Sequence, residues 1–418
     1  MNFPNMIRVR QRFPNPTLES IPEEINTQVM KLDIGKPAEK GPTVAVACSS
    51  RGIANYGSIV KAVISFLKQI GLEPFIVPAM GSHGAATAAG QKRVLEHLGI
   101  NEKEVEAPIR SSLEVVKIGE TEDHIPVYLD KLASEADHIV LINRIKKHTE
   151  FDHEFESGLL KMMAIGLGKQ KGAATYHEAM LTHGYPEVIL TVARKVMQKV
   201  HILFGVGIVE NGYGQTASIG ICPGHKIEEM EKELFKSAKA YAPSLPFDEA
   251  DIIIIDEMGK DISGTGFDTK VVGRIGLPLV TEEPLSPKIK RIVVCDLTQG
   301  SEGNAVGVGI ADIITQRLLD KIDMAALNIN SITGVCPEMG KIPLTLKNDR
   351  EALDVAIKCV GLIPTEKLKI LRIKNTSKLS EVDVSAAYEE ALSNRKDLEI
   401  AIPKRAMVFD QEGNLETF

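Results

Sequence analysis

The hydrophobic positions of the chain follow two alternating periods, and this alternation predicts its fold. Residues 43–48 (TVAVAC), 74–78 (PFIVP) and 138–143 (HIVLIN) are short, nearly continuous apolar runs, as in buried strands. Between the first two runs, residues 58–70 place apolar side chains at helical spacing, and Gly71 follows as a helix-ending residue. Strand, loop and helix thus succeed one another, which favours a parallel sheet covered by helices.

The same pattern begins again near residue 250. Residues 251–256 (DIIIID) and 291–297 (RIVVCDL) predict buried strands, while 309–322 and 349–360 predict helices. The segment 240–246 contains two prolines and no helical period, so we interpret it as a linker.

These elements predict an α/β protein of two α/β domains, with mainly parallel sheet and helices on both faces. We expect an N-terminal catalytic and cofactor-binding domain at 1–248 and a C-terminal domain at 249–418 that closes the cleft between them. The tail from about residue 385 could return to the first domain. In such sheets, ligands bind in the loops that follow the carboxyl ends of the strands.

Composition narrows the possible functions. Lys and Arg total 49 against 56 Asp and Glu, a net charge of −7, which argues against general binding of nucleic acid. Tryptophan is absent, aromatic residues are 5% of the chain, and no apolar run reaches about 18 residues, so no membrane span is expected. The five cysteines are odd in number and form no CxxC pair, which favours a reducing compartment and a cytoplasmic protein.

Histidine is concentrated in one part of the chain. All ten histidines lie between His83 and His225, so any histidine chemistry belongs to the first domain. His83 stands between glycines in a loop after a predicted strand, where a ligand could approach closely. Ser50 and Arg51 follow an earlier strand and could hold an anion. The alternative interpretations are a solvated loop histidine and an ordinary helix cap.

Two further segments carry candidate chemistry. Residues 143–153 form a basic loop with His148, directly after a predicted strand, although such charge runs usually form a solvated face. Lys161 lies inside an apolar run, and a desolvated lysine is the type used for covalent attachment. The turn with Gly168 and Lys169 resembles a phosphate-binding loop, but it has neither the G-x-G-x-x-G nor the Walker A spacing.

Taken together, these segments resemble the lactate racemase family, the nickel-dependent 2-hydroxyacid racemases and epimerases. Residues 50–51 are similar to the family's Ser/Thr-Arg loop, and residues 81–83 (GSH) to its G-T-H motif. His148 corresponds to a family histidine just after a strand. Residues 157–161 (SGLLK), with His177 sixteen positions after the lysine, are similar to the family's S-G-G-x-K and its following histidine.

The resemblance implies a nickel-pincer nucleotide, a pyridinium mononucleotide with two thio-acid arms. It implies that Lys161 attaches one arm covalently and that His177 completes the square plane of Ni(II). It further implies an acid/base pair and a set of residues that hold the cofactor phosphate or the substrate carboxylate. The pair would be His83 and His148, and the anion-holding residues Ser50, Arg51, Gly168 and Lys169. Lys270 joins Arg51 as an expected substrate-binding residue.

The activity implied is inversion of C2 of a 2-hydroxyacid by proton-coupled hydride transfer to the cofactor, with cofactor-synthesis enzymes as partners. Cys48 replaces an acidic residue of the family and Leu159 replaces a glycine, so a substrate other than lactate, such as the sugar acid gluconate, is favoured. The longer stretch before Lys161 makes His153 a rival to His148.

Two alternatives remain open from the sequence. One is a zinc-dependent hydrolase built on His83, His148 and His177. The other is a homologue that binds without catalysis.

Overall fold

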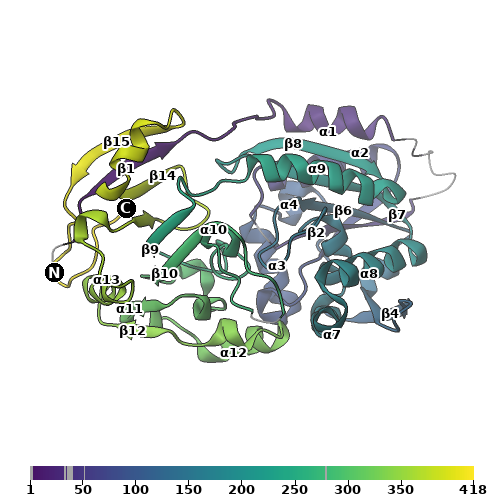
Figure 1. The fold of residues 1–418 in the computed structure, drawn as a ribbon. Helices are drawn as coiled ribbons and strands as arrows, with labels where there is room; N and C mark the ends of the chain where they lie inside the picture. Colours follow the sequence, from purple (N-terminus) through teal and green to yellow (C-terminus); the bar gives the residue numbers. More distant parts are fainter. Residues whose placement is uncertain (1–2, 33, 35–40, 51, 278–279) are drawn as a thin grey trace. The chain divides into compact units, whose positions relative to one another are not determined.

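The computed structural model describes residues 3–32, 34, 41–50, 52–277 and 280–418, in two compact units. Residues 14–242 form the N-terminal unit, and residues 3–13 join 243–418 in the C-terminal unit (Figure 1). Each unit has its own sheet and its own hydrophobic cores. The predicted α/β class is therefore confirmed. Within the described residues, no helix is long and apolar enough to cross a membrane.

The N-terminal unit is built on a five-stranded sheet in the order β3-β2-β6-β7-β8. The first four strands are parallel and β8 is antiparallel to β7. Their bounds are β2 (Thr43–Cys48), β3 (Glu73–Pro78), β6 (His138–Arg144), β7 (Ile202–Glu210) and β8 (Thr216–Pro223). A separate antiparallel hairpin joins β4 (Val115–Glu120) and β5 (Pro126–Asp130).

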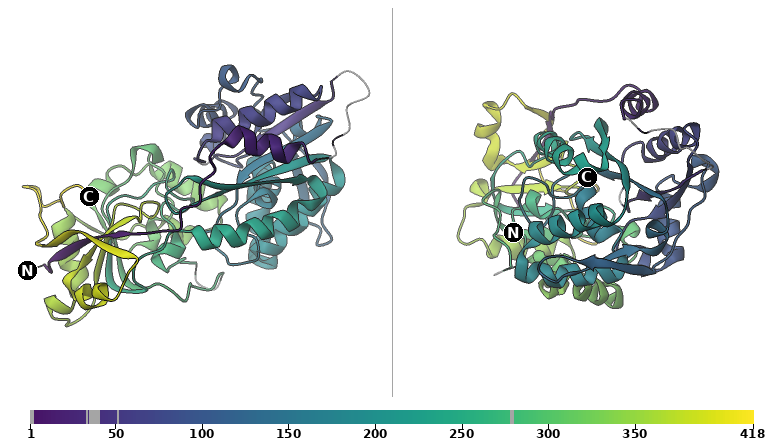
Figure 2. Two further views of the ribbon diagram at one scale, coloured as in Figure 1. Left: turned by 90° about the horizontal axis from the view of Figure 1, so that it is seen from above. Right: turned by 90° about the vertical axis from the view of Figure 1, so that its right-hand side faces the viewer.

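Helices cover both faces of this sheet. Alternate residues of a strand point to opposite faces, so one strand contributes apolar side chains to the cores on both sides. Val44 and Val46 enter one core, and Ala45 and Ala47 enter the other. The left view of Figure 2 shows α1 and α2 on one side of the sheet and α9 on the other. The helices of the unit are α1 (Ile21–Val29), α2 (Tyr56–Gln69), α3 (Ala88–His97), α4 (Glu102–Val105), α5 (Lys131–Ser134), α6 (Leu159–Lys161), α7 (Lys169–His183), α8 (Tyr185–Lys199) and α9 (Ile227–Tyr241).

The C-terminal unit has an eight-stranded mixed sheet in the order β12-β11-β10-β9-β13-β14-β1-β15. Strands β12 to β13 in this order are parallel, and the remaining pairs are antiparallel. The bounds are β1 (Met6–Gln11), β9 (Glu249–Ile255), β10 (Lys288–Val294), β11 (Ile313–Thr315), β12 (Leu344–Leu346), β13 (Ile370–Ile373), β14 (Glu381–Ser385) and β15 (Leu398–Arg405). Its helices are α10 (Thr269–Val272), α11 (Gln316–Leu319), α12 (Met324–Thr333), α13 (Asp349–Lys358) and α14 (Glu389–Ser393).

The structure corrects the predicted division of the chain in two respects. Strand β1 pairs with β14 and β15, so residues 3–13 belong to the C-terminal unit and not to the first domain. The tail after residue 385 stays with that unit through β15, and the division falls after residue 242 rather than 248. The predicted helix at 309–322 is also wrong, because β11 and the short α11 occupy half of it.

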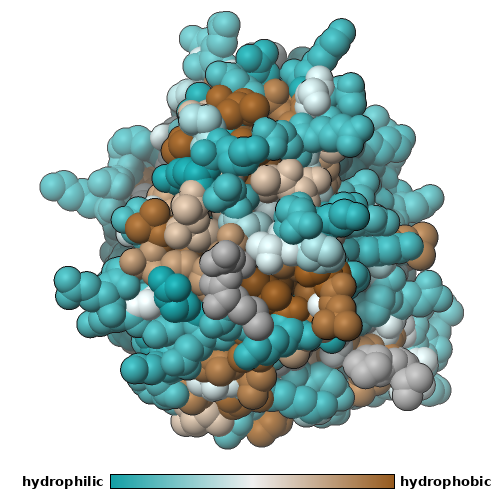
Figure 3. Space-filling view, turned by 60° about the vertical axis from the view of Figure 1, so that its left-hand side comes forward, coloured by the Kyte–Doolittle hydropathy of each residue, from teal (hydrophilic) through white to brown (hydrophobic). Residues whose placement is uncertain are grey.

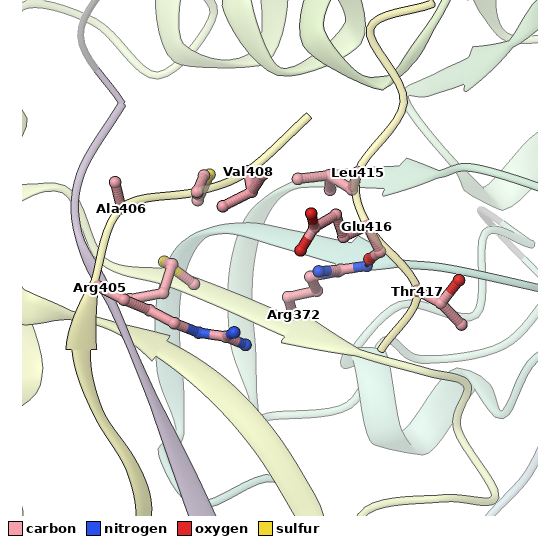
Figure 4. Close-up of a pocket in the computed structure, with 9 residues that line it drawn as sticks. Arg372, Arg405, Ala406, Val408, Leu415, Glu416 and Thr417 are labelled. Carbon is pink, nitrogen blue, oxygen red and sulfur yellow. Dashed lines mark hydrogen bonds between the residues drawn. The ribbon is translucent and has the colours of Figure 1, made fainter. Parts of the chain in front are cut away.

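Charges in the C-terminal unit are largely paired within it. A pocket there is lined by Met6, Arg372, Arg405, 406–408 and 415–417 (Figure 4). Arg372 donates to both carboxylate oxygens of Asp256 at 2.7 and 2.8 Å and to the Glu416 carbonyl at 2.6 Å. The most buried cation of this pocket thus serves the fold. In the view of Figure 3, hydrophobic residues form separate patches between hydrophilic ones.

Candidate active site

The carboxyl ends of β2, β3, β6 and β7 bring four connecting segments to one edge of the N-terminal sheet. Glu210, at the end of β7, accepts a hydrogen bond from the Ala54 amide at 2.6 Å and forms an ion pair with Arg144 at the end of β6. These contacts tie the segments after β2 and β6 to β7. The segments that follow these strands, in which the candidate residues were predicted to lie, are therefore at one edge of the sheet.

His83 is held in a defined orientation in the segment after β3. Its Nδ1 lies 2.6 Å from the Met80 carbonyl oxygen and 3.1 Å from Ser50 Oγ. A carbonyl oxygen only accepts, so we assign the proton to Nδ1. In the neutral ring Nε2 then carries the lone pair, as a general base requires. Ser50, expected to hold an anion, here contacts the catalytic candidate itself.

The loop of His83 packs tightly against its neighbours. The Gly81 amide donates to the Gly166 carbonyl at 3.2 Å, which joins this loop to the segment that follows Lys161. Gly84 has a φ of +66°, and a Cβ there would come within 2.5 Å of the Gly90 carbonyl carbon. Only glycine fits this turn. The His83 loop is thus joined by its backbone to the segment that follows Lys161.

His148 and Lys161 contact each other directly. His148 is buried, and its ring stacks on Phe151 with centroids 4.5 Å apart. The Glu150 amide donates to His148 Nδ1 at 3.1 Å, so the neutral ring carries its proton on Nε2. That Nε2 is hydrogen-bonded to Lys161 Nζ. The contact places the Lys161 amine, which is a nucleophile in its deprotonated form, beside the His148 ring.

The segment that carries Lys161 begins over a buried carboxylate. Glu231 of α9 is completely buried and accepts the Leu160 amide at 2.9 Å, in addition to the Leu159 amide. Burial raises the pKa of Glu231 to about 7. A Cβ at Gly158 would lie 2.4 Å from this carboxyl group, so glycine is required there. After Lys161 the chain forms a π-helix, Met162–Gly166, an irregularity common at functional sites.

His177 lies on α7, half-buried. Ala173, one helical turn earlier, would be 3.8 Å from a Cβ placed on Gly81. Residues four apart share a helix face, so His177 lies on the face of α7 that borders the His83 loop. His153, the rival of His148, instead packs its ring edge-on against Phe155 with centroids 4.7 Å apart.

Other predicted residues are placed differently. Lys169 is completely buried in an ion pair with Asp130, and Gly168 packs against the helix, since a Cβ there would be 2.5 Å from the Ala164 carbonyl. Lys270 lies in α10 of the C-terminal unit. Arg51 lies outside the described residues.

Sequence reasoning missed Glu231, although a signal was available. The buried residues of α9 are Ile227, Glu231, Phe235 and Ala238, so Glu231 occupies a position where helical periodicity calls for an apolar side chain. A carboxylate on the core face of a helix needs a partner, and here the partners are backbone amides.

Within the described ranges, no three His, Cys, Asp or Glu side chains lie together in a way that could hold a metal ion. A site with three protein ligands, as in the zinc hydrolase alternative, has no candidate there.

A comparison with protein-family models finds one match, which lies in the N-terminal unit. Residues 14–187 match the lactate racemase N-terminal domain, and this confirms the predicted resemblance to the lactate racemase family. No curated protein matches the chain.

One solved structure shows a likeness of fold. A Thermotoga maritima protein of 17% identity matches with a TM-score of 0.51 over 88% of this chain and 99% of that one. The lactate racemase apoprotein from Thermoanaerobacterium thermosaccharolyticum matches with 13% identity and a TM-score of 0.47, over 96% of this chain and 100% of that one.

Proposed function

We propose that this protein is an isomerase that inverts C2 of a 2-hydroxyacid, using a nickel-pincer nucleotide attached through Lys161. The observation that carries the proposal is the contact of Lys161 with His148, which places the Lys161 amine beside one of the two acid/base candidates, while the other, His83, is held by Ser50 and the Met80 carbonyl. The matched lactate racemase N-terminal domain supports the same class of activity.

The residues of the site fit the proposed cofactor. Lys161 offers the amine for the covalent link, and His177 offers one nitrogen to a square-planar Ni(II) whose remaining donors are soft. When bound, the cofactor supplies a hydride acceptor for C2. Arg51 and Gly168 remain proposed contacts of its phosphate or of the substrate carboxylate, with Lys270 as a further substrate contact, whereas Lys169 is committed to Asp130.

The two histidines have complementary tasks in this proposal. His83, with its proton fixed on Nδ1 by the Met80 carbonyl, can take the hydroxyl proton of one enantiomer at Nε2. His148 serves the opposite enantiomer, because inversion needs an acid/base group on each side of the carbon. Planar 2-keto acid forms between the two proton transfers and can present either face.

The proposal is tested by co-expression with cofactor-synthesis enzymes. Intact-mass spectrometry should then show a covalent addition, and peptide mapping should place it on Lys161. The loaded protein should interconvert epimers of at least one acid among lactate, malate and gluconate, assayed side by side. A fully loaded protein that epimerises no member of a broad hydroxyacid panel would overturn the activity and favour a homologue that only binds.

A further inference from the structure

Lys169 forms a buried polar cluster with Asp130 and Gln91, and all three side chains are completely buried. The Lys169 ammonium lies 2.7 Å from Asp130 Oδ2, donates to the Pro78 carbonyl, and donates to Gln91 Oε1 at 3.3 Å. An ammonium has three hydrogens, and three acceptors surround this one. Lys169 therefore has no hydrogen left for a bound anion.

Gln91 extends the cluster to both sides of His83. Its amide nitrogen donates to the Gly81 carbonyl at 2.8 Å and to the His83 carbonyl at 3.3 Å. The Pro78 carbonyl, which Lys169 holds, stands where this loop begins. Lys169 thus holds the loop at Pro78, two residues before Met80, whose carbonyl contacts the His83 ring. Gln91 holds the loop at Gly81 and at His83, directly after Met80.

Asp130 anchors the other side of the cluster. Its Oδ1 accepts the Ala133 amide at 3.0 Å and caps α5, and its own amide donates to the Leu167 carbonyl at 2.7 Å. Burial lowers the pKa of Lys169, and the charge of Asp130 opposes that shift. The ion pair is thus tied to the end of β5 and to the end of the π-helix that follows Lys161.

The backbone at Lys169 supports a specific role for its side chain. Lys169 has a φ of +54°, in the left-handed region that non-glycine residues rarely adopt. Such strain persists only where the surrounding contacts over-determine it. The buried contacts of the Lys169 ammonium are among those surrounding contacts.

We propose that Lys169, with Asp130 and Gln91, is a positioning residue for His83. The cluster acts through Gln91 and the loop backbone to hold the Nδ1–H of His83 on the Met80 carbonyl. Its consequence for turnover rests on the proposed epimerase function, but its effect on the His83 ring does not.

The test separates positioning from stability. Lys169→Met alone leaves Asp130 charged and unpaired in the interior, so the decisive variant is Lys169→Met with Asp130→Asn. Asparagine keeps an acceptor for the Ala133 amide and removes the unpaired charge. Gln91→Met is a second route, because it removes the link to the loop, together with one acceptor of the Lys169 ammonium, and leaves the ion pair of Lys169 with Asp130 in place. Lys171→Met is the matched control: this exposed lysine of the same helix turn contacts the Tyr128 ring.

Three quantities are measured on each variant: thermal unfolding, hydrogen–deuterium exchange at His83 ring carbon Cε1 of the apoprotein as a function of pH, and turnover of the loaded enzyme. We expect the double variant and Gln91→Met to unfold near the wild-type temperature, while exchange at His83 becomes about threefold faster as the loop opens locally. Turnover should fall about 10- to 100-fold with little change in KM, because the base is misplaced. Lys171→Met should change none of the three.

If both folded variants keep the wild-type exchange profile of His83 and the wild-type turnover, the cluster is merely structural and the proposal is overturned. If the loaded wild-type protein has no epimerase activity, the proposed function fails. The exchange profiles of the apoproteins still decide the positioning role in that case.

Discussion

Lys161 and Lys169 lie eight residues apart in one apolar segment, yet the structure uses them in opposite ways. Lys161 is half-buried, and its amine contacts a histidine nitrogen. Lys169 is completely buried, and its ammonium forms an ion pair with a carboxylate. The side chain of Lys161 thus lies beside a group that can donate or accept a proton, whereas the side chain of Lys169 is part of the buried structure of the fold.

The difference comes from partners far away in sequence. Position 161 is thirteen residues from His148, whereas Asp130 and Gln91 are brought to Lys169 by β5 and α3. A lysine in an apolar stretch of sequence is therefore expected to have a shifted pKa. Whether such a lysine can act as a nucleophile or forms an ion pair depends on the charge of the partner that the fold places beside it.

The largest expected effect separates the two lysines by covalent loading. Lys161→Ala should show no covalent addition by intact mass and lose more than about 1,000-fold of turnover, because the nucleophile is gone. The Lys169→Met and Asp130→Asn double variant should still gain the full mass. Loading of Lys161→Ala at another lysine would contradict the assignment.

Next in size is the loss of each histidine. His83→Ala or His148→Ala should reduce turnover about 100- to 10,000-fold in both directions, since each direction needs one group as acid and the other as base. Metal content, measured by elemental analysis, should stay unchanged, because neither is assigned as a nickel ligand. His153→Ala is the control and should retain activity. A large loss in His153→Ala with full activity in His148→Ala would exchange their roles.

Substitution of Lys169 should lower the free energy of unfolding more than substitution of Lys161, the reverse of their expected effects on covalent loading. Lys169→Met should lower the free energy of unfolding by about 3 kcal/mol, because Asp130 remains as an unpaired buried charge. Lys161→Met should change it by less than about 1 kcal/mol, since a half-buried side chain is replaced by an apolar one of similar length. Urea unfolding at pH 7 measures both values. Equal effects of the two substitutions would remove the distinction between them.

The smallest expected effect is a pH dependence of stability caused by Glu231, the buried carboxyl group that binds the backbone just before Lys161. The pKa of Glu231 is about 7 in the folded protein and near 4.5 when unfolded, so the native state binds more protons between these values and stability falls as pH rises through them. This group alone should contribute on the order of 2–3 kcal/mol of that loss between pH 4 and 8. In Glu231→Gln this contribution should vanish, so the free energy of unfolding of the variant relative to that of the wild type should increase as pH rises. Parallel stability curves for the two proteins would contradict the burial of a titrating carboxyl group.

Much of the N-terminal fold could be predicted from local pattern. Residues 43–48, 74–78 and 138–143 form β2, β3 and most of β6, and residues 58–70 form most of α2. Their period is set by burial on both faces of a parallel sheet, which a single segment already displays. The loops after these strands, with His83 and His148, followed from the same pattern.

What failed depended on distant pairing. Strand β1 gives no local sign that it joins the C-terminal sheet, where Arg8 pairs with Asp383 at 2.7 Å. At 309–322, Ile313 and Ile314 form a short strand only because β10 and β12 lie beside them. Lys169 was predicted to hold the cofactor phosphate or the substrate carboxylate, and its ion pair with Asp130, 39 positions away, has no local signal in the sequence.

The central claim is that C2 is inverted by hydride transfer at this site, and it is tested most directly by epimerisation in D₂O. Loaded protein should interconvert the two epimers of an active 2-hydroxyacid while nuclear magnetic resonance shows little deuterium at C2, because hydride does not exchange with water. Apoprotein from the same preparation should neither interconvert the epimers nor take up deuterium at C2. Deuterium entering C2 at the rate of turnover would show a deprotonation route and contradict the account.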